Sequence, residues 1–283
     1  MLDGRGSVKR KLGARLWLSG TWLGSMALLA LFARLISPHD PLAQDLFAGR
    51  LPPFWVSGSD PAYLLGTDSL GRDVLSRLIH GARIAFSVAL IAGLATAVVG
   101  SLLGLLAGYM RGWVDVVISR LVDIWMAFPP VLFAILLIAV LGTGLTSIII
   151  AIIVIDWTRF CRVVRAEAMN QSAMDYVSSA IVAGRPRRDI LWREILPNVL
   201  PTIVALSTLE MGIAVIVEAI LSFVNLSIST DAPTWGGMIA EGRTSIYQAW
   251  WVLAFPLAVL FLTVLSFSQF GEGLKDRFDP VLR

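Results

Sequence analysis

The feature that most constrains this 283-residue chain is an uncharged, apolar stretch from Ile84 to Met110. A helix needs about 20 consecutive apolar residues to cross the hydrocarbon core of a bilayer, so this stretch can span one with tilt to spare. The composition agrees, because hydrophobic residues make up 57% of the chain and charged residues only 15%, against about 25% charged in a soluble domain. The sequence therefore predicts an all-α protein embedded in lipid.

Five further apolar segments extend this prediction to a polytopic bundle of about six transmembrane helices. The predicted spans are Trp17–Ala33, Ile84–Met110, Val116–Leu141, Leu145–Val164, Ile195–Leu226 and Tyr247–Phe270. Asp123 and Pro129-Pro130 interrupt the third of them, and prolines inside or at the start of a span indicate kinks or helix starts. Basic residues precede the first span without a convincing cleavage site after it, which predicts a retained signal anchor.

The basic residues predict the orientation, since cytoplasmic loops carry an excess of lysine and arginine. With six spans both termini lie on one side, and most of the 23 basic residues fall on that side. The small net charge of +3 is scattered over segment ends, which argues against a nucleic-acid surface. The predicted parts are a cytoplasmic N-terminus (1–16), a first transmembrane helix (17–37), an external segment with an amphipathic helix (38–82), a transmembrane core (83–274) with a cytoplasmic loop at 165–196, and a cytoplasmic tail (275–283).

The 165–196 loop has the pattern of two short helices separated by a glycine. A helix from Asp175 to Ala183 is predicted to end near Gly184, with Pro186 just beyond it, and a second helical piece runs from Arg187 to Leu196. An exposed helix–Gly–helix of mixed polarity suits a docking element for another protein. A plain amphipathic helix at the membrane interface is the alternative.

Glycines at 100, 104 and 108 recur on one face of the second span. In membranes such spacing allows the backbones of two helices to approach closely. The alternative is the ordinary frequency of glycine in membrane helices. We therefore expect Gly100, Gly104 and Gly108 to pack against a neighbouring span.

Four acidic residues lie in or at the predicted spans, namely Asp123, Asp156, Glu210 and Glu218. A charge at the bilayer centre costs about 2.5–3.5 kcal/mol on insertion scales, so these groups should face protein or water. Glu210 and Glu218 fall near one face of the fifth span and are candidates to line a path. The alternatives are structural pairing with Ser, Thr or Arg neighbours, or protonation. Asp156 is close enough to Arg159 on the same helix to pair with it.

Several classes of site are disfavoured by the residue inventory. A single cysteine, Cys161, excludes an internal disulfide and a multi-cysteine metal site, and the histidines His39 and His80 form no metal-binding pair. No Ser-Lys, paired-Asp or His-rich arrangement indicates an intramembrane enzyme. A nucleotide-binding P-loop needs a lysine after a glycine, and no lysine here follows one; the lysines are Lys9, Lys11 and Lys275.

The loop and three other segments resemble one transporter family. Ser178-Ser179-Ala180, Gly184 and Leu196-Pro197 occupy the spacing of the coupling loop of ABC-importer permeases. Further segments resemble the dipeptide, oligopeptide and nickel branch of these permeases. The order of the segments resembles the C-type subunit of that branch. Those segments are LGTDSLGRDVLSRLIHGAR (65–83), RLVDIWMAFPPVL (120–132), EAILSFVNLSISTDAPTWGGMIAEGR (218–243) and the tail GEGLKDRFDPVLR.

The resemblance implies an ABC type I importer permease in a bacterial cytoplasmic (inner) membrane. It implies a second homologous permease subunit, two cytoplasmic ATP-binding subunits that hold ATP and Mg²⁺, and an extracytoplasmic solute-binding protein, with no cofactor or metal in this chain. The outer segments, including Arg72 and Asp73, would receive the binding protein; a solvated interface helix is the alternative for those two residues. The implied ATPase-coupling residues are Asp175, Tyr176, Val177, Ser178, Ser179, Ala180 and Gly184.

The chain departs from the family at three places. Ser178 stands where the family has a glutamate, Glu194 replaces an isoleucine, and a glycine-rich stretch is replaced by Phe223–Ser227. A salt bridge from position 178 to the ATPase is therefore not expected. The candidate path residues are Glu210, Glu218, Phe223 and Asn225.

Three readings remain open beside a permease for di- or oligopeptides. The same machinery can serve nickel, metal chelates or opine-like solutes. A stand-alone ion-coupled secondary transporter is the alternative of another class, and the inverted repeats that would favour it are not evident. A subunit that binds an ATPase without transporting is the third.

Overall fold

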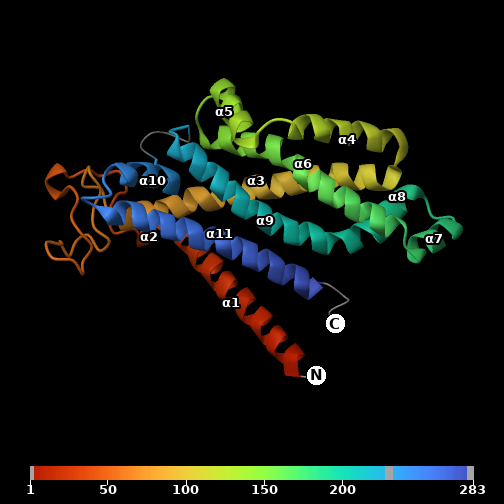
Figure 1. The fold of residues 1–283 in the computed structure, drawn as a ribbon, viewed down its shortest axis with the longest axis horizontal. Coiled ribbons are helices and arrows are strands. Elements are labelled where there is room, and N and C mark those ends of the chain that lie inside the picture. Colours follow the sequence, from red (N-terminus) through yellow and green to blue (C-terminus); the bar gives the residue numbers. More distant parts are fainter. Residues whose placement is uncertain (1–2, 227–231, 279–283) are drawn as a thin grey trace.

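The computed structural model describes residues 3–226 and 232–278, and these ranges contain helices and turns but no β-strand (Figure 1). The helices are α1 (Asp3–Leu31), α2 (Ala33–Ile36), the 3₁₀ turn η1 (Leu46–Ala48), α3 (Val74–Met110), α4 (Gly112–Met126), α5 (Pro130–Leu141), α6 (Leu145–Ser172), α7 (Asp175–Val182), α8 (Arg187–Asp189), the π-helical turn η2 (Ile190–Ile195), α9 (Leu196–Phe223), α10 (Trp235–Thr244) and α11 (Trp250–Phe278).

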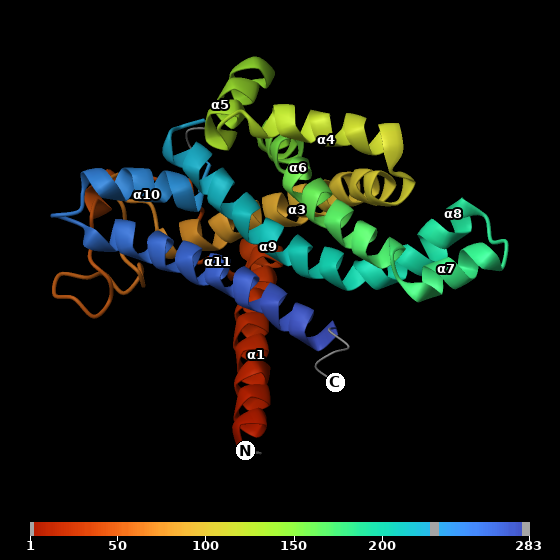
Figure 2. The same cartoon turned by 45° about the vertical axis from the view of Figure 1, so that its right-hand side comes forward.

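The long helices α3, α6, α9 and α11 form an elongated bundle (Figures 1 and 2). The turns that precede α3 lie at one end of it and α7 at the opposite end (Figure 1). Helix α1 contacts α11 and α3 through its second half and diverges from the bundle toward its N-terminus (Figure 2). At that contact the indole Nε1 of Trp22 donates a hydrogen bond to Thr263 Oγ1 at 3.2 Å. The two ends of the bundle are therefore distinct surfaces connected by continuous helices.

Helices α3 and α6 approach each other through glycine. A Cβ added at Gly104 would lie 2.7 Å from the carbonyl oxygen of Cys161, and one added at Gly108 would lie 2.6 Å from that of Arg165. At Gly100 the corresponding distance, to the oxygen of Trp157, is 2.7 Å. Real Cβ atoms essentially never come this close to other atoms, so the three glycines lie directly on the backbone of α6. Helix α6 is therefore the neighbouring span that the glycine spacing predicted without identifying it.

The predicted third span is two helices. Helix α4 ends at Met126, α5 begins at Pro130, and their axes are bent by 87°. Pro130 occupies the first turn of α5, where its missing N–H is tolerated, and Pro129 adopts extended backbone before it. The bend gives either a broken span or a re-entrant loop, as the two prolines in the sequence indicated.

Three helices are long and apolar enough to cross a bilayer within the described residues. They are α3, the continuous helical segment Arg187–Phe223, and the α11 portion Trp250–Lys275, and the bent α4–α5 pair would be a fourth. Helix α6 carries Asp156 near its middle and Arg159, Arg162 and Arg165 after it, so its uncharged part is short. These lengths are compatible with six spans, and the count of six stays a prediction.

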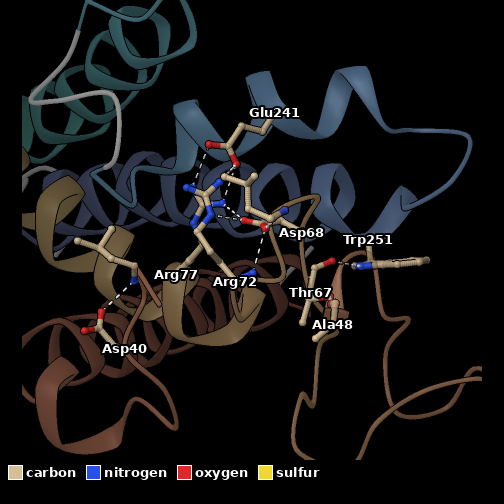
Figure 3. A network of polar contacts seen from close by, with 10 residues as sticks. Asp40, Ala48, Thr67, Asp68, Arg72, Arg77, Glu241 and Trp251 are labelled. Carbon is tan, nitrogen blue, oxygen red and sulfur yellow. Dashed lines mark hydrogen bonds and ion pairs between the residues drawn. The ribbon is translucent and has the colours of Figure 1, made fainter. Parts of the chain in front are cut away.

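The 38–82 segment differs from the expected amphipathic helix. It consists mainly of turns, with only η1 and the first turns of α3 helical. Thr67 holds it together, because its Oγ1 accepts a hydrogen bond from the amide of Leu51 at 2.8 Å and its carbonyl accepts one from Trp251 Nε1 at 3.0 Å (Figure 3). Tertiary hydrogen bonds to α11 therefore replace the helical ones that a separate amphipathic helix would have made.

Candidate functional site

Helix α7 ends in a glycine cap. Gly184 has φ +73°, its amide donates to the carbonyl of Ile181 at 3.0 Å, and the amide of Arg185 donates to the carbonyl of Ala180 at 3.1 Å. This pair of bonds is the Schellman motif, which satisfies the last carbonyls of a helix and needs a residue with positive φ. The predicted break at Gly184 is therefore present, and it fixes where α7 stops.

Helix α7 has one buried and one exposed face. Val177 (1% exposed) and Ala180 (8%) pack in an apolar cluster with residues of α6 and of the η2 turn, including Val164 and Ile190. The opposite face is exposed, and Val182 on it is 88% exposed. The exposed residues of α7 are Asp175, Ser178, Ser179, Ile181 and Val182. An eight-residue helix held by one face and bare on the other has the form of a docking element.

Two polar contacts fix the ends of α7. The phenol of Tyr176 donates to Gln171 Oε1 of α6 at 2.9 Å, and burial raises the pKa of Tyr176, so this donor keeps its proton. After the glycine cap, Arg185 forms an ion pair with Glu194 in η2. The residue at 194 that departs from the family pattern thus anchors the connection from α7 to α9.

Replacing Gly184 by alanine is expected to loosen α7 without moving the rest of the fold. No atom lies within 4 Å of an added Cβ, so the cost is the left-handed backbone alone, about 1–2 kcal/mol. Hydrogen exchange of the α7 amides should become at least about fivefold faster. Gly184→Asn, whose side chain tolerates positive φ, should show a smaller increase, and equal exchange in the alanine variant and the wild type would contradict the assignment.

A cluster of four charged side chains lies at the other end of the bundle (Figure 3). Asp68 accepts hydrogen bonds from Arg72 Nε at 2.7 Å and from Arg77, while Glu241 of α10 accepts from Arg72 Nη2 at 2.7 Å and from Arg77 Nη2 at 3.1 Å. The side chains of Asp68, Arg72 and Arg77 are at most 4% exposed, and that of Glu241 is 31% exposed. The two positive and two negative charges balance, which is what burial of charge requires.

The burial of this cluster corrects one reading of the sequence. A solvated interface helix was an alternative for Arg72 and Asp73, but these residues are 3% and 2% exposed. Asp73 caps α3, since its carboxylate accepts from the amide of Ser76 at 3.0 Å. The partner of Arg72 and Arg77, Glu241, is far away in sequence, and nothing in the local pattern indicated it.

The candidate path residues on α9 lie in two different environments. Glu210 and Glu218 are buried within the chain, at 0% and 1% exposure. Arg159 Nη1 lies 3.9 Å from Glu210 Oε2, and the hydroxyl of Ser222 donates to Glu218. Arginine and serine neighbours are what is expected if the two glutamates have a structural role. In this conformation neither glutamate faces an open channel within the chain, so their role in a path stays a prediction.

Phe223 and Asn225 line a hollow of about 380 Å³ between the end of α9 and α10. The guanidinium carbon of Arg243 lies 5.2 Å from the centre of the Phe223 ring, a cation–π contact. Hydroxyl groups of Ser222, Thr234 and Thr244 also line the hollow. The sequence reading missed Arg243 as a neighbour of Phe223, because the two residues lie on different helices and meet only through the packing of α10 against α9.

Comparison with known sequences places the chain in a family. The profile of the family described as "Binding-protein-dependent transport system inner membrane component" matches residues 100–283. The chain is 38% identical over 254 residues to the di/tripeptide transport system permease protein DppC of Pseudomonas aeruginosa, covering 90% of this chain and 84% of that protein. It is 36% identical over 266 residues to the glutathione transport system permease protein GsiD of Pectobacterium atrosepticum, covering 94% and 86%.

A solved structure shares the fold. An inward-facing form of the MetNI methionine ABC transporter has a chain that matches with a TM-score of 0.61 at 17% sequence identity, over 72% of this chain and 96% of that one. The helical bundle is thus an ABC importer permease fold, as the resemblance implied. With the family profile over residues 100–283 and relatives above 30% identity over nine-tenths of its length, the chain belongs to the binding-protein-dependent transport system inner membrane components, the permease subunits of ABC importers.

Proposed function

We propose that this permease, with a second homologous permease subunit, forms the translocation path of a bacterial importer for di- and oligopeptides. The names of its relatives, which include permeases for di/tripeptides and glutathione, support a peptide cargo. The observation that carries the proposal is α7, a short capped helix between α6 and α9 whose outer face is bare. Such a face suits a partner that supplies movement from outside the bilayer.

Two cytoplasmic ATP-binding subunits supply the energy in this proposal. They bind and hydrolyse ATP with Mg²⁺, because this chain has no lysine in a phosphate-binding loop. The charge distribution supports cytoplasmic termini and a cytoplasmic α7. The exposed serines at 178 and 179 provide no charge for a salt bridge at those positions, so contact with the ATPase relies on Asp175, Ile181, Val182 and hydrogen bonds.

An extracytoplasmic binding protein delivers the peptide to the opposite end of the bundle. The turns before α3 and the α10 region are joined there by the four-charge cluster, which gives the receiving surface a fixed shape. ATP-driven closure of the ATPases would move α7 as a rigid body, and α6 and α9 would transmit this movement to the bundle. Alternation between outward-open and inward-open states follows.

The proposal is tested by reconstituting the complete assembly in liposomes with a radiolabelled dipeptide. We expect ATP-dependent accumulation that requires the binding protein. Accumulation against a gradient by this chain alone would instead support a stand-alone secondary transporter. Uptake of a nickel chelate or an opine, with no uptake of peptides of two to five residues, would support the importer assignment and contradict the peptide cargo.

Placing a charge on the bare face of α7 is expected to uncouple ATP hydrolysis from uptake. Val182 is 88% exposed, so Val182→Asp leaves the fold intact but puts a carboxylate into the apolar docking contact. Loss of such a contact costs about 2 kcal/mol or more, which corresponds to at least about a 30-fold fall in peptide uptake. The isosteric Val182→Thr is the matched control and should keep most of the uptake. Wild-type uptake by the aspartate variant would refute docking through this face.

A further inference from the structure

Glu210 is a buried carboxylate with no hydrogen-bond donor. The residue is 0% exposed, and neither Oε1 nor Oε2 has a partner among the described residues. Arg159 Nη1 is 3.9 Å from Oε2, too far for a hydrogen bond, and the Arg159 side chain is 45% exposed. A buried ionised carboxylate without donors is costly, so Glu210 requires a donor or a proton of its own.

The group that faces Glu210 is a second acid. Asp156 lies one helical turn before Arg159 on α6, is only 5% exposed, and interacts with the carboxyl group of Glu210 on α9. Two ionised carboxylates in contact repel each other, and in known acid pairs one proton is shared between them. The missing donor is therefore supplied if one of the two acids is protonated.

Of the other helices that pack on α6 and α9, α3 and α11 bring no further charge, while Asp123 of α4 is ion-paired with Arg162. Helix α3 has none from Ile84 to Met110, and α11 has none from Trp250 to Phe270. Thr96, on the α3 face that also carries Gly93 and Gly100, has a buried hydroxyl without a partner. Gly93 packs against Met211 of α9 and Gly100 against α6, so this face of α3 lies over both helices. One cation, Arg159, thus stands beside two buried acids.

We propose that Asp156 and Glu210 form a proton-binding site in which the pair shares one proton beside Arg159. The site then has zero net charge, because one carboxylate balances the guanidinium and the other acid is neutral. The shared proton joins α6, which leads into α7, to α9, which follows it. Loss of the proton leaves two like charges between these helices and drives them apart. Protonation of the site therefore controls the contact between α6 and α9, the helices on either side of α7.

Infrared spectroscopy of the purified transporter tests the site without requiring transport. The wild type should show a carbonyl band of a protonated carboxylic acid that disappears at high pH. Asp156→Asn and Glu210→Gln should each abolish this band, because the remaining acid is then balanced by Arg159 and needs no proton. Asp123→Asn is the control, since Asp123 is 55% exposed and ion-paired with Arg162, and it should leave the band unchanged.

Thermal unfolding against pH gives a second measurement. The shared proton stabilises the folded state, so the wild type should lose stability as pH rises through the range where the band disappears. Glu210→Gln should remove that dependence. A band that is merely halved by each substitution, a band that neither substitution changes, or a stability that responds to sodium and not to pH would each overturn the proposal. The result is independent of the cargo, so its failure would leave the transport assignment intact.

Discussion

Replacing Gly104 by leucine is expected to prevent the bundle from folding stably. An added Cβ alone would lie 2.7 Å from the carbonyl oxygen of Cys161 and 3.0 Å from the backbone nitrogen of Arg165. Both atoms belong to the backbone of α6, which cannot turn aside as a side chain could. Overpacking costs about 1–3 kcal/mol even where side chains can adjust, and we expect Gly104→Ala to lie in that range and Gly104→Leu above it. The yield of monodisperse protein in detergent and its thermal midpoint measure the effect.

Gly24 provides the matched control for this substitution. It lies in α1, and no atom lies within 4 Å of an added Cβ. Gly24→Ala should therefore be neutral or stabilise the helix by up to about 1 kcal/mol, since alanine favours helix over glycine. A graded loss from alanine to leucine at position 104, with none at position 24, identifies steric contact as the cause. Equal tolerance at both positions would show that α3 and α6 do not touch there.

Removing the charge of Asp68 is expected to have the next largest effect. Asp68→Asn would leave Arg72 and Arg77 with Glu241 as their only acidic partner in the cluster. Breaking a buried ion pair by removing one partner typically costs about 3–5 kcal/mol, because an uncompensated charge stays buried. The thermal midpoint of the assembled transporter should fall, and the turns before α3 should become sensitive to proteases.

Two further variants separate charge from other causes. Asp60 is exposed, and its carboxylate accepts the amide of Ala62 at 2.9 Å, so Asp60→Asn should change stability by less than about 0.5 kcal/mol. The double variant Asp68→Asn/Arg77→Met restores charge balance, leaving Arg72 opposite Glu241. It should recover part of the lost stability. A double variant less stable than Asp68→Asn would show that Arg77 stabilises the fold through Glu241 and packing even without Asp68.

The features that could be predicted from the sequence are those with a local cause. The uncharged run at 84–110 predicted the long α3, and Gly184 predicted the end of α7, because positive φ at a helix end favours glycine. The two prolines at 129 and 130 indicated the break that the structure shows as an 87° bend. The order of motifs also gave the family, since it reflects the whole chain and not one segment.

The features that could not be predicted depend on contacts between distant segments. The sequence paired Asp156 with Arg159 on the same helix, but the fold also brings Glu210 of α9 to this place. Likewise a solvated helix was an alternative for Arg72 and Asp73, but both residues are buried in the fold, and Arg72 pairs with the distant Glu241. A helical or turn pattern states which side of an element is polar, and only packing decides which polar groups meet.

The length of α3 relates the two ends of the molecule. This helix has 37 residues, about 55 Å at 1.5 Å per residue, and it runs from Arg77 in the four-charge cluster to Gly108 on the last turns of α6 before α7. A rigid rod of that length converts a small tilt into a large displacement, about 5 Å for a tilt of about 5°. A tilt of a few degrees at one end therefore shifts the other end by roughly one helical turn.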